Sequence, residues 1–250
     1  MTQRFKDKVA VITGGNSGIG LAAAKAFARE GAKVAITGRS EDTLRAAEKE
    51  IGAGTLALQA DLSKLAGIAA FRDRVRETFG RIDALFVNHG VAIPGAFESV
   101  SEAHFDEMVD TNVKGAFFTI QKTLPLLTRD SAVILNASIN AHRANSAGAV
   151  YALTKAAIVN LGKSLASDLA PRGIRVNVIS PGPVETPIFG RMGFPEEQMR
   201  QMKEQVAGLV PLKRFARPDE IAAAVLFLAS SESSYVVGSE LIVDGGMMRT

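Results

Sequence analysis

Tyr151 and Lys155 are the side chains best suited by type and spacing to proton-transfer chemistry. They stand four positions apart in a segment with helical periodicity, so the phenol and the ammonium project from one helix face. A tyrosine has a reference pKa of about 10, and lowering it by about three units takes roughly 4 kcal/mol. A nearby lysine cation acts in that direction. The pair alone is a common chance pattern, but the chain has only two tyrosines, and this one begins an apolar helix.

Ser138 is a second candidate for the same chemistry. It follows the apolar segment 132–136, which predicts a strand, and so lies just beyond the carboxyl end where open α/β sheets bind ligands. A hydroxyl there can hold a substrate carbonyl and stabilise developing negative charge. Without Tyr151 we would interpret Ser138 as a loop-capping residue.

The segment 13–20, Thr-Gly-Gly-Asn-Ser-Gly-Ile-Gly, joins a predicted strand to a predicted helix. Glycines allow a sharp turn and close approach to a pyrophosphate, and a helix N-terminus offers free N–H groups to the anion. The spacing G-x-x-x-G-x-G differs from the dinucleotide fingerprint G-x-G-x-x-G, and a simple tight turn is the alternative. Its place after the first strand favours phosphate binding.

The end of the second predicted strand, Gly38-Arg39-Ser40, bears on which nucleotide binds. Gly38 has no carboxylate that would repel a ribose 2′-phosphate. The Arg39 guanidinium is a cation whose N–H donors can bind such a phosphate at two points. Arg39 could instead be solvated, and Glu41 or Asp42 could reach the ribose if the strand ends elsewhere. We expect NADP(H) in preference to NAD(H).

Short apolar segments alternate with helical patterns along the whole chain. Crossover units of this kind predict a mainly parallel sheet. The expected α/β fold is a Rossmann-type doubly wound parallel sheet of about seven strands, with helices on both faces and a single domain over residues 1–250. A TIM barrel also fits this alternation, so the motifs must decide. Strands are expected at 9–13, 33–37, 55–60, 82–87, 132–136, 174–179 and 240–243, and helices at 18–30, 41–51, up to 79, 104–127, 150–170 and 218–229.

The composition of the 250 residues excludes several classes of site and partner. With no cysteine there is no disulfide or thiolate ligand, and three dispersed histidines suggest no metal site. The 29 basic and 26 acidic residues are interspersed, which argues against a nucleic-acid partner. The polar N-terminus and short apolar runs indicate no signal peptide and no membrane span, so we expect a cytoplasmic protein.

Taken together, the motifs resemble those of the short-chain dehydrogenase/reductase family over essentially the whole chain. They are the 13–20 segment, Asn88-His89-Gly90, Asn112, Ser138, Tyr151 with Lys155, and Pro181-Gly182, in the family's order and spacing. One departure is Val87-Asn88-His89-Gly90, where the family usually has Asn-Asn-Ala-Gly.

The resemblance implies roles for individual residues. Tyr151 would be the general acid or base, Lys155 would lower its pKa and bind the nicotinamide ribose, Ser138 would orient the substrate oxygen, and Asn112 would hold a water that extends the proton relay. Asp61 would contact the adenine, Asn88 would brace the sheet beside the ribose, and Val184 and Thr186 would hold the carboxamide. The expected cofactor contacts are Gly14, Asn16, Ser17, Gly18, Ile19, Gly20, Gly38, Arg39, Ser40, Asp61, Leu62, Asn88, Gly90, Tyr151, Lys155, Pro181, Gly182, Val184 and Thr186.

Two segments are candidates for the substrate pocket. Residues 187–212 include Ile188 and Phe189 and predict an apolar lid, with an amphipathic surface helix as the alternative. Between Ser138 and Tyr151, the side chains of Asn140, His142 and Asn145 could line the pocket. Arg143 could bind an acidic substrate, although a solvated loop arginine is the favoured interpretation.

The resulting hypothesis is an NADP(H)-dependent oxidoreductase that interconverts ketones or aldehydes and alcohols by hydride transfer. A 3-oxoacyl-acyl-carrier-protein reductase or a sugar dehydrogenase of the same family is the alternative, and a non-catalytic nucleotide-binding sensor is the rival from another class. The helix that starts near Tyr151 is apolar on nearly all sides, and family members commonly pair such helices, so we expect a homotetramer.

Overall fold

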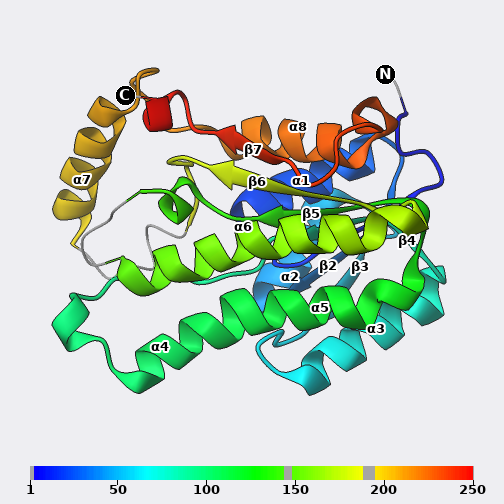
Figure 1. Cartoon of the computed structure of the whole chain (residues 1–250). Helices are drawn as coiled ribbons and strands as arrows, with labels where there is room; N and C mark the ends of the chain where they lie inside the picture. The colour runs from blue at the N-terminus through cyan, green and yellow to red at the C-terminus, as the bar shows by residue number, and fades with distance from the viewer. Residues whose placement is uncertain (1–2, 144–147, 188–194, 250) are drawn as a thin grey trace.

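The computed structural model describes residues 3–143, 148–187 and 195–249, and seven parallel strands in this part form one sheet (Figure 1). Their order is β3-β2-β1-β4-β5-β6-β7, the doubly wound arrangement predicted from the sequence. The strands are β1 Val9–Ile12, β2 Lys33–Gly38, β3 Leu56–Gln59, β4 Ile82–Val87, β5 Leu127–Asn136, β6 Arg175–Pro181 and β7 Glu240–Val243.

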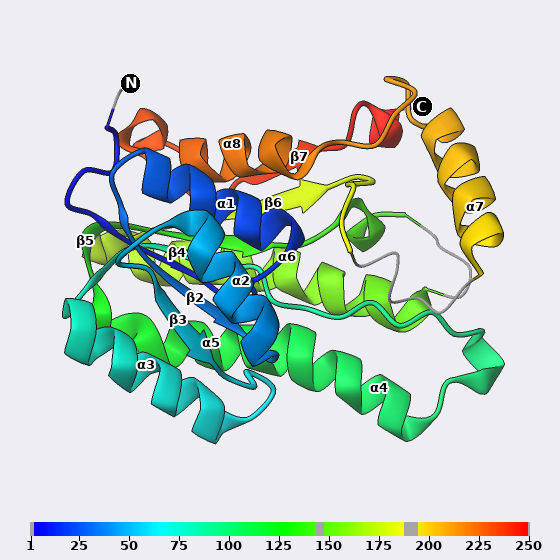
Figure 2. The same ribbon diagram turned by 180° about the vertical axis from the view of Figure 1, so that it is seen from behind.

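Helices cover both faces of the sheet, as Figures 1 and 2 show. One apolar core lies between the sheet and α1, α2 and α8, and the other between the sheet and α3, α5 and α6. Buried strand side chains alternate between these two cores, which is why the strands are apolar throughout rather than on one side. The helices are α1 Gly18–Arg29, α2 Glu41–Ile51, α3 Leu65–Phe79, α4 Glu102–Val109, α5 Gly115–Thr123, α6 Ala149–Leu169, α7 Glu196–Leu209 and α8 Pro218–Ala229.

The prediction of one continuous helix over residues 104–127 is wrong, because the helix is interrupted and also ends earlier. A π-helical turn, Asp110–Lys114, separates α4 from α5, and β5 already begins at Leu127. Within this turn the Asn112 side chain holds the main chain of Val91, accepting from its N–H at 2.8 Å and donating to its carbonyl at 2.9 Å. The backbone N–H of Gly115 donates to the Asp110 carbonyl, five residues earlier, in place of the usual spacing of four, and helical periodicity does not reveal this change.

The order in which strands are added to the sheet reverses between β1 and β4, which are parallel neighbours in the middle of the sheet. In open α/β sheets ligands bind beyond the carboxyl ends of the strands at such a point. α7 stands apart from the sheet at this end of the molecule (Figures 1 and 2). No helix in the described ranges is long and apolar enough to cross a bilayer.

Candidate active site

A cavity of about 860 Å³ lies beyond the carboxyl ends of the strands. It brings together most of the residues singled out in the sequence, from the glycine segment to the tyrosine and lysine of α6. The predicted residues that line it are Gly14, Asn16, Ser17, Gly18, Ile19, Gly38, Arg39, Ser40, Asp61, Leu62, Asn88, Gly90, Ser138, Asn140, Tyr151, Lys155, Pro181, Gly182, Val184 and Thr186.

The other predicted residues lie elsewhere. Gly20 and Asn112 are not part of the cavity lining, and the His142 imidazole contacts Glu240 on β7 instead. Asn145, Ile188 and Phe189 lie outside the described residues.

The segment between β1 and α1 has the geometry of an anion site. Gly18 has φ +53°, and a Cβ on it would lie 3.1 Å from Thr186 Cγ2, so any other residue at this position would be strained. Ser17 makes no capping hydrogen bond, and the first turn of α1 carries no acidic side chain. The free N–H groups at this helix N-terminus therefore face the cavity without a side-chain partner, which fits a cofactor phosphate.

The predicted ribose end of the cavity is formed by the residues that follow β2 and β3. Gly38 packs so closely on Asn16 that an added Cβ would lie 2.6 Å from its Cγ. The exposed Arg39 lines the cavity together with Asp61, which accepts from Ser63 N at 3.0 Å and Ser63 Oγ at 2.8 Å. Burial raises the pKa of Asp61, but these bonds and the charge of Arg39 outweigh it and lower the pKa below its usual value. This end therefore offers both a cation and a carboxylate.

Asn88 connects the ends of three strands. Its Nδ2 donates to the carbonyls of Thr13 and Gly14, both at 3.1 Å, and its Oδ1 accepts from Asn136 Nδ2 at 2.9 Å. This is the bracing position predicted for Asn88.

Tyr151 and Lys155 lie in the first two turns of α6, close to Ser138. Lys155 Nζ is 5.6 Å from the centroid of the Tyr151 ring and donates to the Asn136 carbonyl at 2.8 Å. Burial lowers the pKa of Lys155 to about 8. Burial also raises the pKa of Tyr151, and a hydrogen bond with Ser138 only partly offsets this. The expected lowering of the Tyr151 pKa by the lysine is therefore wrong for the chain alone, because the loss of solvent outweighs it.

Asn112 is 2% exposed and lies behind this cluster. Besides its two bonds to Val91, its Nδ2 donates to Thr154 Oγ1 at 3.1 Å. Thr154 is the residue before Lys155 on α6. Asn112 thus links α6, through Thr154, to the loop that follows β4.

His89 is a residue of the cavity lining that the sequence analysis did not assign to the site. Its Nδ1 is 2.8 Å from Thr13 Oγ1. Burial, together with the charge of Lys155, lowers its pKa to about 4, so the imidazole is neutral at physiological pH. The sequence signal that could have pointed to His89 was its departure from the family's Asn-Asn-Ala-Gly pattern.

Apolar side chains from three separate segments form the remaining wall. α7 contributes to it from the outer side, in the segment predicted as a lid. Grouped by segment, these residues are Val91 and Ile93 after β4, Ile139 after β5, and Met202, Val206 and Leu209 of α7. In the described ranges, no group of three or more histidine, aspartate or glutamate side chains is placed to hold a metal ion.

Comparisons with known proteins agree with this geometry. The model of the family described as enoyl-(acyl carrier protein) reductase matches residues 14–248. The oxidoreductase asL5 of Sarocladium schorii is 38% identical over 247 residues, which cover 98% of this chain and 97% of the relative. The crystal structure of levodione reductase superposes with a TM-score of 0.93 at 34% identity, covering 98% of this chain and 99% of that chain. A short-chain dehydrogenase/reductase of Caenorhabditis elegans, solved with cofactor, superposes with a TM-score of 0.93 at 33% identity, covering 99% and 97%. The chain belongs to the short-chain dehydrogenase/reductase family, whose members are oxidoreductases that bind a nicotinamide cofactor and act on CH–OH groups.

Proposed function

We propose that this protein is an NADP(H)-dependent oxidoreductase that interconverts ketones or aldehydes and alcohols. The observation that carries the proposal is that Tyr151, Ser138 and Lys155 line the same cavity as the uncapped N-terminus of α1. The bound cofactor would supply or accept the hydride. One relative is named for the reduction of levodione, which supports a carbonyl substrate.

Tyr151 is the proposed proton donor in reduction and the acceptor in oxidation. Its raised pKa keeps the phenol protonated at neutral pH, which is the state that a donor requires. Ser138 would hold the substrate oxygen beside the phenol. Lys155, whose pKa is about 8, carries a positive charge at neutral pH and would bind the nicotinamide ribose. Asn112 would support the relay from behind Lys155.

The preference for NADP(H) rests on Gly38, Arg39 and Ser40. Arg39 lines the cavity and is exposed, so its guanidinium is available to a ribose 2′-phosphate, with Ser40 beside it. Arg39→Gln should lower kcat/KM for NADPH by about 10- to 100-fold and leave that for NADH nearly unchanged. Arg45→Gln, on the exposed side of α2, is the matched control. A wild-type preference for NADH would contradict the assignment.

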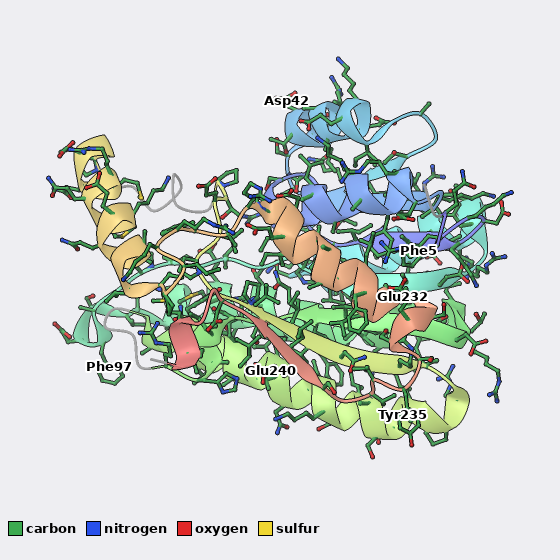
Figure 3. The ribbon with its side chains drawn as sticks, turned by 90° about the horizontal axis from the view of Figure 1, so that it is seen from above. Phe5, Asp42, Phe97, Glu232, Tyr235 and Glu240 are labelled. Carbon is green, nitrogen blue, oxygen red and sulfur yellow. The ribbon has the colours of Figure 1, made fainter. Side chains whose placement is uncertain are left out.

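The catalytic role is tested by Tyr151→Phe, with the other tyrosine as control. Tyr235 is 102% exposed, and Tyr235→Phe should leave turnover unchanged; Figure 3 shows this residue at the surface. Tyr151→Phe should bind NADPH normally and lose about 100-fold or more in kcat. Turnover near the wild-type rate in that variant would refute the role.

Two alternatives within the family share the same motifs. The description of the matching family names an acyl-carrier substrate, but one whose carbon–carbon double bond is reduced, so a 3-oxoacyl-acyl-carrier-protein reductase and a sugar dehydrogenase both remain alternatives. A screen of NADPH oxidation over ketones, aldehydes, acyl thioesters and sugars separates them. A protein that binds NADPH and turns over none of these would favour the non-catalytic sensor.

The exposed apolar side chains favour a homotetramer. Phe105 and Phe117 are exposed on α4 and α5, and Phe227 and Ile242 on α8 and β7. Two separate apolar faces allow two isologous interfaces, which generate a tetramer. Phe117→Glu and Phe227→Glu should each give a dimer by light scattering. A monomeric wild-type protein at micromolar concentration would contradict the proposal.

A further inference from the structure

Arg143 is a cation of the cavity lining to which the proposed chemistry assigns no role. In the part of the chain that the structure describes, the lining side chains with a full charge are Arg39, Asp61, Arg143 and Lys155. Arg39 and Asp61 attract each other, and Lys155 donates to the Asn136 carbonyl. Within those same described residues the Arg143 guanidinium makes no hydrogen bond or ion pair, so it lines the cavity without a counter-charge.

The position of Arg143 separates it from the predicted adenosine end. Arg39 follows β2, whereas Arg143 belongs to the loop that follows β5, and β1 and β4 lie between these two strands. With neighbouring strands about 4.8 Å apart, the two strand ends are about 14 Å from each other. Arg143 therefore lies on the side of Ser138 and Tyr151, where the substrate must sit.

The loop is held so that Arg143 lines the cavity. The preceding residue, His142, contacts Glu240 Oε1 through Nε2 at 2.7 Å, and Ser180 Oγ donates to the same oxygen at 2.5 Å. The Glu240 side chain is only 10% exposed and lies on β7, where Figure 3 labels it. This contact holds His142 against β7 at the edge of the sheet, and the side chain of the next residue, Arg143, lines the cavity.

The surroundings of Arg143 make an anion its natural partner. The lining shared with Arg143 includes apolar side chains such as Ile139 and Met202, and the carboxylate of the described lining, Asp61, follows β3 at the other end. Residues 144–147, which follow Arg143 in the sequence, contain no acidic residue. A guanidinium in an apolar, partly enclosed site binds a carboxylate or phosphate strongly, because little solvent competes.

We propose that Arg143 binds an anionic group of the substrate, so that the enzyme acts on carbonyl compounds with an apolar body and a carboxylate or phosphate. This inference rests on the proposed function, because it assigns the anion to the substrate of the same site. The anion could be the carboxylate of a free oxo acid or the phosphate of a phosphopantetheine thioester.

The test compares matched substrates in the holoenzyme. A series of oxo acids of increasing length is assayed against their methyl esters, and 3-oxoacyl thioesters of 4′-phosphopantetheine against those of pantetheine. We expect the wild type to favour one charged series by about 10- to 100-fold in kcat/KM. Arg143→Gln should abolish this preference, Arg143→Lys should keep part of it, and Arg172→Gln, an exposed arginine outside the cavity, should leave it intact. The preferred series identifies the source of the anion.

Each outcome decides between the inference and the function on which it rests. If the wild type has equal kcat/KM for the charged and uncharged compounds in both series, the inference is overturned and the proposed function still stands. If Arg143→Gln weakens NADPH binding instead, the residue serves the cofactor and the inference fails. If no carbonyl compound is turned over, the proposed function fails, and calorimetry still decides the anion site. In that case the protein with NADPH should bind the anionic compounds of one series at least about 10-fold more tightly than their uncharged analogues, and Arg143→Gln should remove this difference; equal binding overturns the inference.

Discussion

Removing the buried imidazole of His89 should change how the stability of the protein depends on pH. Thr13 Oγ1 accepts from the N–H groups of Asn88 at 2.9 Å and His89 at 3.2 Å, and it lies 2.8 Å from His89 Nδ1 and 3.4 Å from the Phe86 carbonyl. Burial and the charge of Lys155 lower the pKa of His89 to about 4, against 6.5 for an unperturbed histidine.

The sign and size of the effect follow from these two values. Between about pH 6.5 and pH 4 the unfolded chain binds a proton that the folded chain does not, so the free energy of unfolding falls as the pH falls. For a histidine with pKa 6.5 unfolded and about 4 folded, the loss between about pH 7 and about pH 5 is about 2 kcal/mol. In His89→Ala the free energy of unfolding no longer contains this pH-dependent contribution. The loss of packing also lowers the free energy of unfolding of the variant, but by the same amount at every pH.

The assay is urea unfolding of the wild type and His89→Ala across this pH range, without cofactor. The wild type should be the more stable protein at neutral pH, and its advantage over the variant should shrink by about 2 kcal/mol on acidification to about pH 5. Titrating groups that do not interact with His89 are shared by the two proteins and cancel in the difference. An advantage that stays constant with pH would refute the reasoning.

Three further predictions concern other parts of the site. Gly38→Ala would bring a Cβ within 2.6 Å of Asn16 Cγ, so NADPH affinity should fall by about 10-fold in fluorescence titration; unchanged affinity would argue against close packing there. Glu240→Gln replaces the charged partner of His142, and should lower the free energy of unfolding by about 1–2 kcal/mol in urea; an unchanged midpoint would mean that the contact contributes nothing. Subtracting the tyrosinate absorbance titration of Tyr151→Phe from that of the wild type isolates Tyr151, which should ionise above its reference pKa of about 10 without cofactor; a lower value would contradict the dominance of burial.

The sequence predicted those features whose determinants are local. β1 and β4 are bounded by glycines and charged residues, and their apolar segments were placed to within a residue. The glycine segment and the Tyr151–Lys155 pair were recognisable because each is defined by the spacing of residues that are close together in the sequence. The π-helical turn at Asn112 was not, because its contact with Val91 spans 21 residues. The direction of His142 was also missed, since its partner Glu240 lies 98 residues further along the chain.

The protonation of Tyr151 shows why the chemistry is harder to predict than its location. Spacing places a cation near the phenol and suggests a lowered pKa, but the helix that brings them together also buries both groups. Burial disfavours each charged form, so it raises the pKa of Tyr151 and lowers that of Lys155 to about 8. As the pH rises, the lysine therefore loses its charge before the tyrosine can ionise. The chain alone maintains a protonated phenol beside an ammonium at neutral pH, which suits donation to a carbonyl oxygen. Accepting a proton from an alcohol requires additional positive charge at the phenol, beyond what the side chains of this chain provide.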